Sequence, residues 1–156
     1  MFLLLIGIPI ITEILIMVSI ALSKNFLIMF IAFAIMMLYF MVVFFGWFYT
    51  LGINLYKKLP NTVNMNLTMF KIALFYPTIY ILLFYLFMYG ILNQAVSGSS
   101  LNPAIFLLII PLHLFAMFCI FYTLYFNAKS LKSVELQRPV HFSDYAGEFF
   151  LIGFFP

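Results

Sequence analysis

Charged side chains are scarce in this sequence. Asp, Glu, Lys and Arg make up 7% of its 156 residues, whereas an average soluble domain carries about 25%. Seven basic and four acidic residues cannot supply the polar surface that a soluble globule of this length needs. The composition therefore excludes a water-soluble fold. The hydrophobic content of 67% also excludes a disordered chain, because disorder requires low hydrophobicity.

Cysteine and the common catalytic motifs are equally sparse. The single Cys119 cannot form an internal disulfide, which excludes a disulfide-stapled secreted domain. The sequence has no cysteine pair, no glycine-rich phosphate loop, no HExxH motif and no Gly-x-Ser-x-Gly motif. We therefore expect no metal site and no cofactor, and a non-enzymatic role is favoured. The net charge of +3 indicates no nucleic-acid partner, since in so apolar a chain the placement of basic residues matters more than their sum.

Long apolar runs occupy most of the chain instead. Crossing the hydrocarbon core of a bilayer takes about 20 mostly apolar residues in a helix. Four stretches satisfy this length: residues 2–22, 26–48, 69–92 and 103–126. The runs are unbroken, whereas the strands of a membrane barrel alternate apolar and polar residues. The sequence thus predicts an all-α, polytopic membrane bundle, with a four-helix transmembrane domain over residues 1–128 and a tail over residues 129–156.

The basic residues predict the orientation of the bundle. Four spans place the amino terminus, the connection between the second and third spans, and the tail on one side. That side carries six of the seven basic residues, Lys57, Lys58, Lys71, Lys129, Lys132 and Arg138, and the other side carries Lys24. Because basic loops remain cytoplasmic, we predict that both termini are cytoplasmic.

Glu13 is the most informative polar residue in the predicted spans. A charged carboxylate near the centre of a span costs at least about 2.5 kcal/mol, and such residues usually face a bundle interior or a pathway. If each span is centred on the bilayer, Tyr39, Tyr80 and His113 lie at a similar depth. We consider two interpretations: the four residues form a ligand or proton-exchange site, or Glu13 and His113 serve only as hydrogen-bonded packing groups.

The fourth predicted span has one face of small and polar residues. At helical spacing this face contains His113, Ala116, Thr123 and Asn127, with Cys119 adjacent. Small residues let membrane helices approach closely. We therefore predict that this face packs against other helices and that His113 points inward.

The tail differs in composition from the rest of the chain. Ser143 is a candidate helix cap with Asp144 in the first turn, and Asp144 and Glu148 share a face at a spacing of four. One interpretation is an interfacial amphipathic helix with a solvated acidic face. The other is a docking surface formed by Arg138, His141, Asp144 and Glu148. The apolar residues 149–156 are too few to span, and they are also compatible with the start of a fifth span.

Several segments of the tail carry a family resemblance. They are residues 135–140 (ELQRPV), 142–145 (FSDY), 147–152 (GEFFLI) and 154–156 (FFP). Together they resemble a segment of uncharacterised small multi-pass inner-membrane proteins of Bacteroidota bacteria. The resemblance implies a bacterial inner membrane and carries over no catalytic residue.

Three functions follow from these features, in order of preference. The first is an accessory or scaffolding subunit of a bacterial membrane complex, whose partners are the lipid bilayer and either other membrane subunits or copies of itself. The second is a proton-linked transporter or binder of a lipophilic molecule that uses Glu13 and His113. The third is an intramembrane enzyme acting on a lipid or quinone, with the same pair as acid and base.

Overall fold

The computed structural model describes residue 7 and residues 10–12, 14–18, 26–98 and 104–154. These residues contain three long helices, α2 (Phe26–Tyr56), α3 (Leu67–Val96) and α4 (Ala104–Leu136), and a shorter one, α5 (Phe142–Phe154). Residues 10–12 and 14–18 are also helical, and the described part of the chain contains no strand. The all-helical fold class is confirmed. The chain forms two compact units, Met1–Gly46 and Trp47–Pro156, whose boundary falls inside α2.

Three of these helices are long and apolar enough to cross a membrane. The candidate spans are Phe30–Tyr56, Leu67–Gln94 and Leu107–Leu136. Each exceeds the length of about 20 apolar residues that the hydrocarbon core requires, so the described chain has three helices that fit a membrane protein. The first predicted span, residues 2–22, lies mostly outside the described residues and remains a prediction.

The helices extend beyond the ends that hydropathy predicted. α2 continues past residue 48 to Tyr56, and α4 continues past residue 126 to Leu136. The tail predicted to begin at residue 129 is therefore, in its first part, the last two turns of α4. The physical reason is that an apolar run ends where the bilayer core ends, whereas a helix ends only where its backbone hydrogen bonding stops.

Local residues explain where the helices begin and end. Asn66 caps α3, since its side-chain Oδ1 accepts a hydrogen bond from the Met69 N–H at 3.0 Å. α4 ends at Leu136. The next residue, Gln137, has a left-handed φ of 52° and donates from Nε2 to the Val134 carbonyl at 2.7 Å. Two residues further on, Pro139 prevents the helix from continuing.

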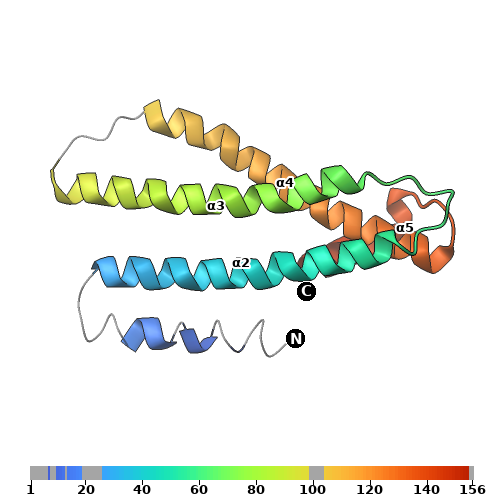
Figure 1. Ribbon diagram of the computed structural model, residues 1–156, viewed down its shortest axis with the longest axis horizontal. Helices are drawn as coiled ribbons and strands as arrows, with labels where there is room; N and C mark the ends of the chain where they lie inside the picture. Colours follow the sequence, from blue (N-terminus) through green and yellow to red (C-terminus); the bar gives the residue numbers. More distant parts are fainter. Residues whose placement is uncertain (1–6, 8–9, 13, 19–25, 99–103, 155–156) are drawn as a thin grey trace. The chain divides into compact units, whose positions relative to one another are not determined.

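The core of the unit Trp47–Pro156 lies where α2, α3 and α4 meet. Its largest fully buried side chains are Phe48, Phe70 and Phe126, one from each helix. The Phe70 and Phe126 rings stack with centroids 4.2 Å apart. Figure 1 shows that α3 and α4 lie apart where α4 begins and converge towards this junction. The remaining helix, α5, packs on the last turns of α4.

Candidate functional site

The predicted packing face of α4 is buried from Ala116 to Asn127. Ala116, Cys119, Thr123 and Asn127 are each almost completely shielded from solvent. The Thr123 hydroxyl donates to the Cys119 carbonyl at 3.0 Å, which satisfies it within its own helix. Asn127 reaches another helix, donating from Nδ2 to the Phe48 carbonyl of α2 at 3.5 Å. The face therefore joins α4 to the carboxyl-terminal part of α2.

The buried face continues beyond the predicted residues. Ser130 and Ser133 are also fully buried, and they extend the same row at helical spacing. Three oxygens on this row, Asn127 Oδ1, Ser130 Oγ and Ser133 Oγ, have no hydrogen-bond partner among the described residues. The signal that could have revealed this extension is the unbroken spacing of three or four between small residues, which hydropathy alone does not show.

Gly52 allows α2 to approach this junction closely. A Cβ atom at this position would overlap the Phe70 ring and would lie 2.8 Å from Asn127 Oδ1. Only glycine leaves room for these two side chains from α3 and α4. The glycine therefore allows the three helices to approach closely at this point.

Two of the four predicted midplane residues are in contact. The Tyr80 hydroxyl of α3 lies 3.1 Å from His113 Nδ1 of α4, and their ring centroids are 5.7 Å apart. Tyr39 lies in α2 within the other compact unit, and Glu13 lies outside the described residues. The structure thus brings together the Tyr80 and His113 members of the predicted cluster.

The surroundings of His113 differ from the expectation. Its side chain was predicted to point inward with the packing face, but it is exposed. Because α4 diverges from α3 towards its start (Figure 1), residues before Ala116 are not covered as the later ones are. Tyr80 itself is buried, and its neighbour Tyr76 donates to the Leu112 carbonyl at 3.4 Å. The pair therefore lies at the edge of the α3–α4 contact.

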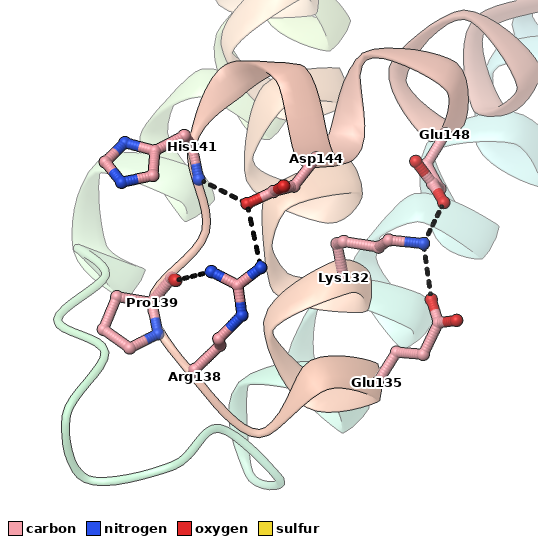
Figure 2. A network of polar contacts seen from close by, with 7 residues as sticks. All are labelled: Lys132, Glu135, Arg138, Pro139, His141, Asp144 and Glu148. Carbon is pink, nitrogen blue, oxygen red and sulfur yellow. Dashed lines mark hydrogen bonds and ion pairs between the residues drawn. The ribbon is translucent and has the colours of Figure 1, made fainter.

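The tail residues form a network of ion pairs between α4 and α5, shown in Figure 2. Lys132 Nζ of α4 contacts Glu148 Oε1 of α5 at 2.9 Å and Glu135 Oε2 at 3.0 Å. Arg138 lies 3.7 Å from Asp144 Oδ2. The Lys132 hydrogen bond lowers the pKa of the Glu148 carboxyl below its ordinary value, because a neighbouring cation favours the charged form. The network fastens α5 to α4.

The amino terminus of α5 is capped differently from the prediction. The helix begins at Phe142, so Ser143 lies inside the first turn and does not precede it. Asp144 Oδ2 accepts the His141 N–H at 3.0 Å, which is the reaching-back half of a capping box. The expected cap at Ser143 is therefore wrong, whereas the position of Asp144 in the first turn is confirmed.

The acidic face of α5, which was predicted to face solvent, is mostly shielded. The Asp144 and Glu148 side chains are only 25% and 23% exposed because they face the cations of α4 and its following turn. The exposed residues are Phe142, Ser143, Gly147, Phe150 and Leu151, and the last four fall within about 100° of the helix circumference. Tyr145 and Ile152 are buried. The helix is amphipathic, but its outer face is small and apolar.

Neither a metal-ligand cluster among the described residues nor a similarity to a known protein identifies a further functional site. Among the described residues, no group of three or more His, Cys, Asp or Glu side chains could hold a metal ion. The chain matches no protein-family model, no curated protein and no solved structure.

Proposed function

We propose that this protein is a multi-pass protein of a bacterial inner membrane, with four spans and cytoplasmic termini, and that it serves as a non-enzymatic accessory or scaffolding subunit. The proposal assigns α5 as the element that other subunits bind. Three apolar candidate spans support the membrane setting. Six of the seven basic residues lie on one predicted side of the membrane, and they support the orientation because basic segments remain cytoplasmic.

The observation that carries the subunit role is the outer face of α5. This helix of 13 described residues follows the predicted fourth span, and ion pairs of its acidic side chains hold it to α4 and to Arg138. Phe150 and Leu151 are nevertheless 56% and 58% exposed. Exposed apolar side chains outside a membrane span are typical of an interaction surface when they lie together.

Two small residues on the same face indicate what kind of partner fits. Ser143 and Gly147 are four residues apart and exposed, and a Cβ atom on Gly147 would meet nothing within 4 Å. A small-x-x-x-small pair lets a second helix approach the backbone closely. The face thus presents small residues near the start of α5 and apolar residues near its end to a partner helix. Ion pairs of its acidic side chains with Lys132 and Arg138 hold α5 in place.

Native mass spectrometry of the protein extracted gently from its own membrane tests this role. We expect a stoichiometric complex with at least one other membrane protein. The Gly147→Leu variant is expected to lose the partner, because the new side chain fills the space for the second helix. Leucine favours a helix over glycine by about 0.8–1 kcal/mol, so loss of binding would not reflect a weakened α5.

A matched control is available in α3. Gly90 is also exposed with nothing within 4 Å of its Cβ position, and Gly90→Leu is expected to retain the complex. A wild-type chain that is recovered alone or only with copies of itself would contradict the accessory role. Equal loss of the partner in both variants would contradict the assignment of α5.

A further inference from the structure

Three exposed lysines flank the connection between α2 and α3. Lys57 and Lys58 follow the last residue of α2, and Lys71 lies in the second turn of α3. The connection itself, residues 57–66, contains no Asp or Glu. Among the described residues, the acidic side chains all pair with Lys132 or Arg138. The three lysines therefore carry positive charges that no described carboxylate neutralises.

Packing of three aromatic rings brings these lysines to the same end of the helices. Tyr56 stacks on Phe126 with ring centroids 6.4 Å apart, and Phe126 stacks on Phe70 at 4.2 Å. Lys57 follows directly after Tyr56, and Lys71 follows directly after Phe70. Since successive residues of a helix point about 100° apart, the rings meet at the junction while the lysines are turned away from it. Figure 1 shows the end of α2, the connection and the start of α3 together at this end.

Two candidate membrane spans also end here. The span Phe30–Tyr56 ends immediately before Lys57, and the span Leu67–Gln94 begins about one helical turn before Lys71. A lysine close to the end of a span extends its ammonium group to the membrane surface. Anionic headgroups give that surface a negative potential, which attracts basic segments next to a span. The three lysines therefore meet a layer of the opposite charge.

We propose that Lys57, Lys58 and Lys71 bind the headgroup of an anionic phospholipid. Its phosphate oxygens accept hydrogen bonds from the ammonium groups, each of which carries three donors and no acceptor. An anionic headgroup is favoured over a zwitterionic one, because choline or ethanolamine would add a positive charge beside the three lysines. The assignment rests on the membrane setting proposed above and does not depend on the accessory role of α5.

Trp47, the single tryptophan of the chain, provides the probe for a test. It is partly exposed and precedes Lys57 on α2, and bromine atoms on lipid acyl chains quench tryptophan fluorescence on contact. The purified protein is reconstituted in phosphatidylcholine vesicles that contain a fixed share of either brominated phosphatidylglycerol or brominated phosphatidylcholine. We expect stronger quenching by the anionic lipid, and the ratio of the two signals gives its relative binding constant.

Single substitutions of the lysines test their role. Lys57→Gln, Lys58→Gln and Lys71→Gln are each expected to lower the relative binding constant by up to about fivefold, the value of one cation at an anionic membrane surface. The matched controls Lys57→Arg, Lys58→Arg and Lys71→Arg keep the charge and are expected to retain the preference. Circular dichroism verifies that each variant is folded.

Each other outcome contradicts the assignment. Equal quenching of the wild type by both lipids would show that no anionic headgroup binds at this end. An unchanged preference in all three glutamine variants would place the headgroup elsewhere, and equal losses in the arginine variants would show that charge is not what binds it. Loss of the preference in inorganic phosphate, but not in chloride of the same ionic strength, would show that the lysines hold free phosphate. A chain that does not enter the vesicles would contradict the membrane setting itself.

Discussion

The Lys132 ammonium of α4 lies 2.9 Å from the Glu148 carboxylate of α5. The same ammonium group lies 3.0 Å from Glu135, one turn further along its own helix. Lys132 and Glu148 are both mostly shielded, with side-chain exposures of 20% and 23%. This contact joins α4 to α5, and we expect it to make the docking of α5 sensitive to pH.

The sign of the pH effect follows from Glu148. Its pKa is lower in the folded protein than its ordinary value of 4.5. Such a carboxyl stabilises the fold above the ordinary pKa, and this contribution is lost as the pH falls through the folded-state value. We expect the difference in Tm between the wild type and Glu148→Gln to be largest at neutral pH and to shrink as the pH falls below 4.5. Thermal unfolding followed by circular dichroism measures it.

Glu135 provides the matched control for this experiment. Its side chain is 58% exposed, so solvent screens its pairing with Lys132 more strongly. Glu135→Gln is expected to lower the Tm less than Glu148→Gln does at neutral pH. A Tm difference for Glu148→Gln that does not change with pH would show that the pair does not hold α5.

The close approach at Gly52 predicts a large cost for one added methyl group. Gly52→Ala places a Cβ against Phe70 and Asn127, and overpacking of this kind costs about 1–3 kcal/mol. Gly46→Ala, in the same helix, meets nothing within 4 Å and is expected to be neutral or to stabilise by up to about 1 kcal/mol. Unfolding in mixed detergent micelles gives both free energies. Equal changes in the free energy of unfolding for the two variants would show that the helices can move apart at Gly52 without cost.

The end of α4 predicts an order of stability among variants of Gln137. Its φ of 52° is strained for most side chains and unstrained for glycine. Gln137→Gly loses the hydrogen bond to Val134 but gains conformational freedom, so it is expected to lie within about 1 kcal/mol of the wild type. Gln137→Val is expected to be less stable than Gln137→Gly by about 1–2 kcal/mol. The reverse order, measured as Tm, would exclude a left-handed residue at this position.

The cap of α5 is tested with two neighbouring residues. Asp144→Ala removes the acceptor of the His141 N–H and the partner of Arg138, and loss of a helix cap typically costs about 1 kcal/mol. Ser143→Ala leaves the described cap intact and is expected to have little effect on helix stability. Hydrogen exchange of the α5 amides compares the two. Faster exchange of the α5 amides in Ser143→Ala than in Asp144→Ala would show that Ser143, and not Asp144, caps the helix.

The sequence by itself determined the class of the protein. Apolar runs near residues 26–48, 69–92 and 103–126 predicted membrane helices because transfer of a segment into the bilayer depends mainly on its own composition. The small residues Ala116 and Cys119 indicated the packing face by helical spacing alone. Both properties are local, so they can be deduced without knowing the partners of any residue.

Only the tertiary structure decided which polar groups meet. Lys132 and Glu148 are 16 residues apart, and Tyr80 and His113 are 33 residues apart. Such contacts depend on how α3, α4 and α5 cross, and no local preference encodes a crossing. The same limit explains the outer face of α5: its acidic residues were expected to face solvent, but the cations of α4 and Arg138 draw them inward. Hydropathy determines where a helix lies, and long-range packing determines which side of it remains free.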